Sequence, residues 1–193
     1  MDTKMKNRIR EVYSICLWAV LFILSRFTGI ADVLCGKGIE HIHGEYWRFL
    51  TASFLHTGLF HLISNCIGLY FATGYLDGKV SGIVIALLGI AGGTIANLLF
   101  SLMTPSAGSS MGGSVIVFAI IGVIAAMQIM CKSQEPFRFG TRYGNWTAGY
   151  IILGNLLNGS LKVGDISTLK IHLLSFVIGG ILGAACISGK IIR

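Results

Sequence analysis

The chain has 193 residues, of which 54% are hydrophobic and only 12% charged, and its mean hydropathy is +0.77. These values lie outside the range of soluble globular domains and predict an all-α membrane protein in contact with a lipid bilayer. The net charge of +7 does not indicate a nucleic-acid partner, because the sequence has no basic stripe with interleaved aromatic residues.

Six apolar segments can be placed along the chain, and a helix needs roughly 20 such residues to cross a bilayer. They cover residues 12–30, 54–76, 80–103, 113–131, 145–159 and 168–189. The fifth is short and weakly apolar. The first follows a basic stretch, but it is too long for a signal peptide and has no small-residue cleavage site, so we expect it to be retained. The sequence thus predicts a cytoplasmic segment, residues 1–11, and one six-helix membrane domain, residues 12–190.

The distribution of lysine and arginine predicts the orientation of the chain. With the N-terminus inside, the cytoplasmic side carries ten of the fifteen basic residues and the outer side carries five. We therefore expect both termini in the cytoplasm, and a bare six-helix core is typical of the bacterial plasma membrane. The outer connection 31–53 contains Trp47 and Arg48, which favour the lipid–water interface, so this loop is expected to lie partly in the outer leaflet.

Three polar clusters enter the apolar segments from the same side of the membrane. They are His56…His61…Asn65, Gly112-Gly113-Ser114 and His172. Hydrocarbon tolerates such groups poorly, so their gathering at one depth indicates a functional site. A hydroxyl, an imidazole and an amide donor are the groups that acyl transfer requires.

The apolar segments lack the motifs of several protease classes, which limits the kinds of catalytic site that the chain could form. The apolar segments contain no aspartate pair for an aspartyl protease, no His-Glu-x-x-His zinc motif and no acid for a Ser-His-Asp triad. The five cysteines occur singly, without a C-x-x-C pair, so they indicate neither a disulfide framework nor a zinc site. A serine–histidine dyad remains, with no metal or organic cofactor implied.

Ser114 is the preferred nucleophile because two glycines precede it, which places its N–H near a helix N-terminus that favours an anion. Ser110 follows a similar local pattern and is an alternative. His172 is the candidate base, although each residue alone is more often structural. Small residues follow His172 along one helix face: Ser175, Gly179 and Gly183. They would let this helix approach the helix of Ser114, which has Gly122 at i+8, closely enough for a hydrogen bond.

His61 and Asn65 share a helix face at i and i+4, beside the expected position of the nucleophile. Asn65 is predicted to stabilise an oxyanion, with His61 as a second donor. For His56 we expect instead hydrogen bonds to neighbouring helices or to loop carbonyls.

Four motifs in order resemble the rhomboid family of intramembrane serine proteases, over about residues 46 to 183. They are Trp47-Arg48, the stretch from His56 to Asn65, Gly112-Gly113-Ser114 with Phe118 and Gly122, and His172-x-x-Ser175-x-x-x-Gly179. The aromatic residue and the glycine four and eight positions after the serine fit Ser114 and not Ser110. The resemblance implies a six-transmembrane-helix bundle of rhomboid type with an interfacial first outer loop.

The resemblance also implies a role for each matched residue. Ser114 would be the nucleophile and His172 the general base, while Asn65, His61 and the Ser114 amide would stabilise the oxyanion. Phe118 would pack against the His172 ring in place of a third triad residue. The matched supporting positions are Gly112, Gly113, Gly179, Trp47 and Arg48.

Two positions depart from the family pattern. The glycine usual after the serine is Val115, whose branched side chain is expected to crowd the oxyanion site or alter the turn. The first glycine of the last-helix stripe is Ser175, which is expected to loosen the helix contact.

The sequence therefore predicts an intramembrane serine endopeptidase that cleaves transmembrane protein substrates in or beside their membrane segments. Residues 145–159 and the following loop, about 160–167, are candidates for a lateral gate and a cap, partly by analogy with the family. The alternative is a catalytically impaired rhomboid-like protein that binds transmembrane helices without cleaving them, which Val115 favours. A small transporter or proton channel that uses the histidines is less favoured, because the membrane segments contain no acid.

Overall fold

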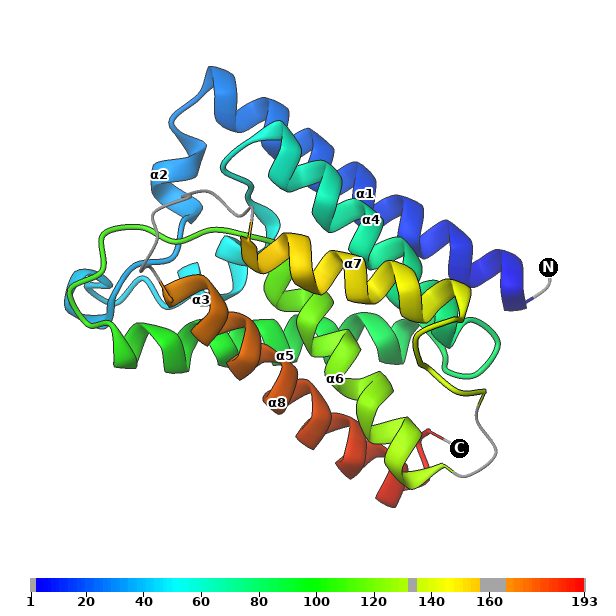
Figure 1. Ribbon diagram of the computed structural model, residues 1–193. Coiled ribbons are helices and arrows are strands. Elements are labelled where there is room, and N and C mark those ends of the chain that lie inside the picture. The colour runs from blue at the N-terminus through cyan, green and yellow to red at the C-terminus, as the bar shows by residue number, and fades with distance from the viewer. Residues whose placement is uncertain (1–2, 132–134, 157–165, 193) are drawn as a thin grey trace.

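The computed structural model describes residues 3–131, 135–156 and 166–192, and the regular secondary structure of these parts is helical apart from one isolated bridge between Gly36 and Ser110. The long helices are α1 (Thr3–Phe27), α4 (Leu59–Leu76), α5 (Gly82–Met103), α6 (Ser114–Met130), α7 (Arg142–Leu156) and α8 (Ser167–Ser188) (Figure 1). The all-helical class is confirmed. Since α1 runs through residue 12, the domain boundary placed there stays a prediction.

Three of these helices, α4, α5 and α8, are long and apolar enough to cross a membrane. Ser14–Phe27 and Ser114–Met130 are shorter apolar stretches. The helix α6 is short because it begins inside the bundle, where Gly112, Gly113 and Ser114 are all buried. The prediction of six membrane spans is therefore neither confirmed nor contradicted by the helix lengths.

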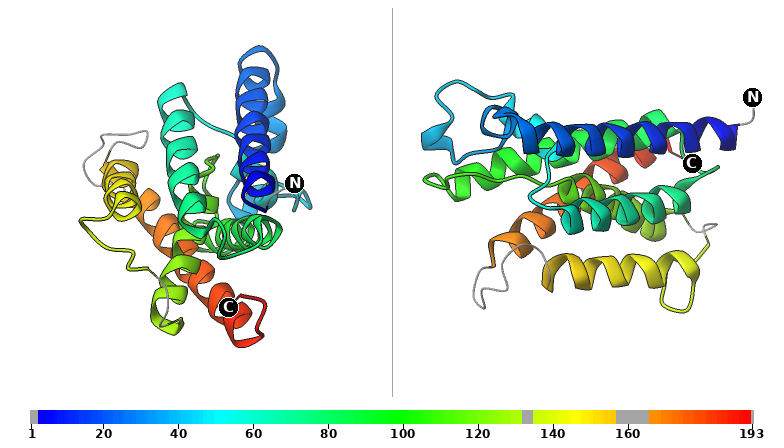
Figure 2. Two further views of the ribbon diagram at one scale, coloured as in Figure 1. Left: turned by 90° about the vertical axis from the view of Figure 1, so that its right-hand side faces the viewer. Right: turned by 90° about the horizontal axis from the view of Figure 1, so that it is seen from above.

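The helix α6 forms the centre of the bundle and packs against α4, α5 and α8. Its residues are buried on every side from Ser114 to Ile124, and a helix that is apolar all round is typical of a core position. The end-on view shows α1 on one side of α4 and α7 on the other (Figure 2). The two candidate chemical groups, on α6 and α8, thus lie on the most tightly packed helix pair.

Glycines on α6 and α8 bring the two helix backbones together. A Cβ atom on Gly122 would collide with the carbonyl oxygen of Phe176, and one on Gly179 would collide with the carbonyl oxygen of Ala119. The predicted close contact of small residues is therefore confirmed. Ser175 does not loosen this contact, because it is fully buried and its hydroxyl donates to the Ile171 carbonyl of its own helix at 2.7 Å.

The connection between α1 and α4 contains short helical elements: α2 (Ile30–Leu34), η1 (Ile39–His41), α3 (Arg48–Thr51) and η2 (Ala52–Phe54). It is a folded structure whose position at a lipid interface stays a prediction. The predicted cap, about residues 160–167, lies largely outside the described residues, and the predicted gate 145–159 is described only as far as the end of α7.

Gly179→Ala is expected to destabilise the protein by about 1–3 kcal/mol, because the new methyl group meets the α6 backbone, which cannot move aside. Gly180→Ala is the matched control on the same helix. A Cβ there meets only the Gly122 carbonyl oxygen, at an ordinary 3.6 Å, and alanine favours the helix. Thermal unfolding in detergent micelles measures both variants. Equal unfolding midpoints would contradict the packing described here.

Candidate active site

The hydroxyl of Ser114 and the imidazole of His172 are in direct contact. Ser114 is the first residue of α6, and its Oγ lies 2.9 Å from Nε2 of His172 near the start of α8. Both side chains are buried, with 5% and 2% of their surface exposed. A hydrogen bond of this length allows direct proton transfer between the two groups.

The ring of His172 also has a fixed orientation. Phe118, one helical turn after Ser114, stacks on it with ring centroids 4.1 Å apart and an angle of 13° between the planes. This is the contact that the resemblance implied. Stacking covers one face of the imidazole and prevents it from rotating away from Ser114.

The other ring nitrogen of His172 has a partner that sequence reasoning missed. Nδ1 lies 2.9 Å from the side-chain oxygen Oδ1 of Asn155, near the end of α7. The only signal in the sequence was a polar side chain in the weakly apolar fifth segment. Nothing in the local pattern of α7 tells which helix this asparagine contacts.

Two side chains on α4 offer hydrogen-bond donors: His61, which lines the same groove as Ser114, and Asn65, one helical turn further along the same face. Nδ2 of Asn65 and Nε2 of His61 are buried and have no hydrogen-bond partner in the described parts of the chain. Their other polar atoms are occupied, since Asn65 Oδ1 accepts from the Tyr150 hydroxyl at 2.9 Å and His61 Nδ1 lies 3.0 Å from Thr57 Oγ1. The Ser114 N–H, in the first turn of α6, has no acceptor within its own helix.

Gly112 keeps open a small space between these groups. A Cβ on this residue would lie 3.0 Å from Cε1 and 3.2 Å from Nε2 of His61, and 3.3 Å from Ser114 Oγ. A substrate carbon in that space would therefore be within reach of both the hydroxyl and a donor. Gly113 has a different task, because its Cβ would lie 2.6 Å from the ring of Trp18 and so displace α1.

A groove of about 430 Å³ leads to Ser114 and His172. Its walls mix hydroxyl groups with apolar side chains, among them Thr57, Met111, Thr168 and Ile171. Ser110 also lies on this wall, but it pairs through its backbone with Gly36, and no hydrogen bond from its hydroxyl to a histidine occurs among the described residues. The geometry therefore favours Ser114 over Ser110 as nucleophile.

The expectation for His56 is wrong. The ring is 1% exposed, and neither nitrogen has a hydrogen-bond partner in the described structure. Its neighbours are rings instead, with Trp18 at 5.1 Å and His61 at 5.2 Å, both in edge-on geometry. Aromatic packing between α1 and α4 thus takes the place of the polar contacts that we expected.

Val115 is accommodated by a glycine on the facing helix. Its Cγ2 lies 3.0 Å from the position of a Cβ on Gly93, so a larger residue at Gly93 would collide with it. The branched side chain packs into α5 at this point, and the helical turn that carries Ser114 is intact.

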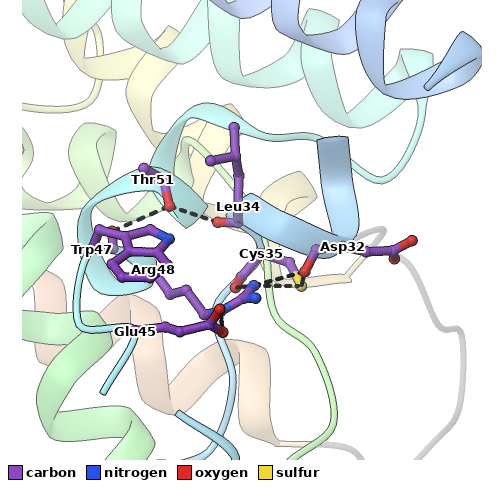
Figure 3. A network of polar contacts seen from close by, with 7 residues as sticks. All are labelled: Asp32, Leu34, Cys35, Glu45, Trp47, Arg48 and Thr51. Carbon is purple, nitrogen blue, oxygen red and sulfur yellow. Dashed lines mark hydrogen bonds and ion pairs between the residues drawn. The ribbon is translucent and has the colours of Figure 1, made fainter. Parts of the chain in front are cut away.

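Arg48 organises the connection between α1 and α4 (Figure 3). Only 4% of its surface is exposed, while its neighbour Trp47 is 48% exposed. Its Nη1 donates to the carbonyls of Asp32 (2.7 Å) and Cys35 (3.0 Å), and its Nε donates to Glu45 at 2.6 Å. The hydrogen bond from Arg48 holds the pKa of Glu45 below its ordinary value, so this pair stays charged at neutral pH.

This connection is joined to the turn before Ser114. The carbonyl of Ala52, which directly follows α3, accepts a hydrogen bond from the N–H of Gly112 at 3.0 Å. The bridge between Gly36 and Ser110 adds two further backbone hydrogen bonds of 2.8 Å. Arg48 therefore supports the site through the backbone, without contacting Ser114 or His172 itself.

Comparison with known proteins identifies the family. Residues 43–189 match the sequence model of the Rhomboid domain, which is most of the chain. The chain belongs to the rhomboid family. The family domain and the apolar helices together make it a membrane protein.

Individual relatives differ in length and in what their names state. The chain is 31% identical over 147 residues to RHOMBOID-like protein 1 of Arabidopsis thaliana, a match that covers 75% of this chain but 35% of that protein. It is 21% identical over 159 residues to "Putative rhomboid protease YdcA" of Bacillus subtilis, covering 82% and 76%. Inactive RHOMBOID-like protein 8 of Arabidopsis thaliana is 34% identical over 94 residues, covering 49% and 25%.

Arg48→Ala is expected to destabilise the protein by about 2–3 kcal/mol, because the buried Cys35 carbonyl and the partly buried hydrogen bond to the Asp32 carbonyl lose their donor. Labelling of the buried Cys35 thiol by a maleimide, followed by mass spectrometry, should become faster in this variant. The matched control is Trp47→Ala, which removes a half-exposed side chain and should change stability by less than about 0.5 kcal/mol. Unchanged Cys35 labelling in Arg48→Ala would rule out the anchoring role.

Proposed function

We propose that the chain is an intramembrane serine endopeptidase that cleaves peptide bonds in or next to the transmembrane segments of membrane proteins. The observation that carries this proposal is the 2.9 Å contact between the buried Ser114 hydroxyl and His172 Nε2, at the end of a groove. His61, whose Nε2 is an unpaired donor, lines the same groove, and Asn65 offers a second unpaired donor on the same face of α4. No cofactor is needed for this chemistry.

The residues fit the steps of acyl transfer. Nε2 of His172 takes the Ser114 proton as Oγ attacks the scissile carbonyl carbon, and the carbonyl oxygen becomes an oxyanion. His172 then gives the proton to the leaving amine as the C–N bond breaks, which leaves an acyl-enzyme. A water molecule, deprotonated by His172, hydrolyses this ester and restores Ser114.

Three donors would stabilise the oxyanion in both steps: Asn65 Nδ2, His61 Nε2–H and the Ser114 N–H. The hydrogen bond between Thr57 Oγ1 and His61 Nδ1 supports this assignment. If the Thr57 hydroxyl donates to Nδ1, the ring proton of neutral His61 resides on Nε2, the nitrogen that faces the space beside Gly112.

The chemistry limits which peptides can react. A transmembrane helix hides its carbonyls in its own hydrogen bonds, so the segment at the cut must unwind before Ser114 reaches it. Substrates with helix-weakening glycine or proline near the cut are therefore preferred. The charge distribution supports both termini inside and the site toward the outer face of the membrane. The bare six-helix core fits a bacterial plasma membrane, and α7 as the lateral gate rests partly on analogy with the family.

The alternative is a rhomboid-like protein that binds transmembrane helices without cleaving them. The relative whose name contains "Inactive" favours it. Val115 also departs from the family pattern at this position, although its side chain packs against Gly93 and leaves the turn of Ser114 intact. The two functions differ in whether Ser114 is an activated nucleophile.

Ser114→Ala should abolish labelling of the purified protein by a fluorophosphonate probe and cleavage of a single-pass membrane substrate, and His172→Ala should abolish both because Ser114 then lacks its base. Ser110→Ala is the matched control and should keep probe labelling. A wild-type protein that neither reacts nor cleaves, under conditions in which an active rhomboid does both, would support the binding function instead.

Gly112→Ala should lower the rate of cleavage at least about 100-fold while the protein stays folded, because the methyl group occupies the space between His61 and Ser114. Gly108→Ala, in the same connection, is the control, since no described atom lies within 4 Å of the added methyl group. Cleavage rates and thermal unfolding midpoints are measured together. Normal cleavage by Gly112→Ala would show that the substrate carbonyl binds elsewhere.

A further inference from the structure

The amide of Asn155 has one defined orientation. Its Nδ2 donates to the carbonyl oxygen of Ile151 at 2.8 Å, and its Oδ1 faces Nδ1 of His172 at 2.9 Å. A carbonyl oxygen can only accept, so the group that faces Ile151 must be the NH₂. The oxygen of Asn155 therefore faces the imidazole, and Nδ1 must carry the proton.

This arrangement leaves His172 in the tautomer that a base needs. With the proton on Nδ1, Nε2 has a free lone pair that accepts the Ser114 hydroxyl proton. In the other tautomer, an unprotonated Nδ1 would face the Asn155 oxygen, and an N–H would face Ser114. The Asn155 contact therefore selects the tautomer, and the Ser114 hydroxyl, which can donate or accept, is compatible with it.

A second residue of α7 holds the oxyanion donor in the same way. The hydroxyl of Tyr150 donates to Oδ1 of the fully buried Asn65 at 2.9 Å, which fixes the orientation of that amide and leaves its Nδ2 as an unpaired donor. Tyr150 is itself confined, because its ring fills the space left by Gly68 and lies 5.5 Å from the ring of Phe118.

The opposite end of α7 is anchored elsewhere. Phe71 and Trp146 stack with their centroids 4.7 Å apart and the planes 6° apart, and α4 is the main packing partner of α7. Among the described residues, the hydrogen bonds that link α7 to the site are the one that Tyr150 donates to Asn65 and the one that Asn155 accepts from His172.

We propose that α7 is the positioning helix of the site: Asn155 fixes the tautomer of His172, and Tyr150 fixes the amide of Asn65. The catalytic effect rests on the function proposed above, whereas the effect on the imidazole does not. Substrate entry that displaces α7 would disconnect the base and the oxyanion donor together, so that hydrolysis requires α7 to return.

The kinetic test uses Asn155→Leu and Tyr150→Phe in the full-length protein. Each should lower kcat by about 10- to 100-fold and leave KM within about twofold, because neither residue contacts substrate. Asn155→Asp, which keeps an acceptor oxygen, should restore most of the loss. Tyr143→Phe is the matched control on the same helix, since the Tyr143 hydroxyl has no hydrogen bond among the described residues, and its kcat should not change.

The spectroscopic test does not depend on proteolysis. In protein labelled with ¹⁵N-histidine, the signals of His172 are identified by their loss in His172→Ala. The wild type should show the Nδ1–H tautomer, Asn155→Leu should shift the population toward Nε2–H, and Asn155→Asp should restore it. A protein that cleaves nothing but shows this shift refutes the proposed function and not the positioning of the ring.

Other results overturn the inference. The inference is wrong if Asn155→Leu changes neither the tautomer of His172 nor kcat. It is also wrong if Asn155→Leu raises KM and leaves kcat unchanged. Thermal unfolding shows whether each variant is folded. If Asn155→Leu does not fold, the test uses Tyr150→Phe, which removes a single oxygen atom. A kcat of Tyr150→Phe below that of Tyr143→Phe supports the role of α7, and equal values overturn it.

Discussion

The contact between the hydroxyl of Ser114 and the imidazole of His172 depends on how closely two helix backbones can approach. On α6 and α8, glycines at 122 and 179 face carbonyl oxygens of the other helix, where no side chain would fit. With larger residues there, the helices would separate, and a hydrogen bond of 2.9 Å could not form. Glycines about two helical turns away from Ser114 and His172 therefore decide whether the hydroxyl and the imidazole meet.

Much of this arrangement could be predicted from the sequence, because the signals are local or periodic. The helices lie where the apolar segments predict them, and the spacing from Ser114 to Phe118 identifies a pair on one helix face. The stripe that begins at His172 likewise predicts the side of α8 that meets α6. Helical periodicity shows which residues share one face of a helix. Here it identifies the face of α8 that packs against α6.

The rest depends on contacts that no spacing encodes. Asn155 and Tyr150 lie on a short helix of mixed composition, and their partners are 17 and 85 residues away. The expectation for His56 was wrong because a buried imidazole was assumed to need polar partners, whereas two neighbouring rings enclose it. Val115 looked disruptive only because the glycine that receives it lies on another helix. In each case the deciding information is which helices are neighbours in space.

The connection that contains Arg48 has a base, which is hydrogen-bonded to the rest of the protein, and an exposed bend at His43 and Gly44. Its base is bound to the turn before Ser114, whereas His43 and Gly44 adopt positive φ angles at an exposed bend whose backbone hydrogen bonds are local. Insertions are tolerated best at exposed loop tips. A short epitope inserted between these two residues would therefore give antibodies access to the native protein, while the same insertion a few residues later would break the Arg48 anchor.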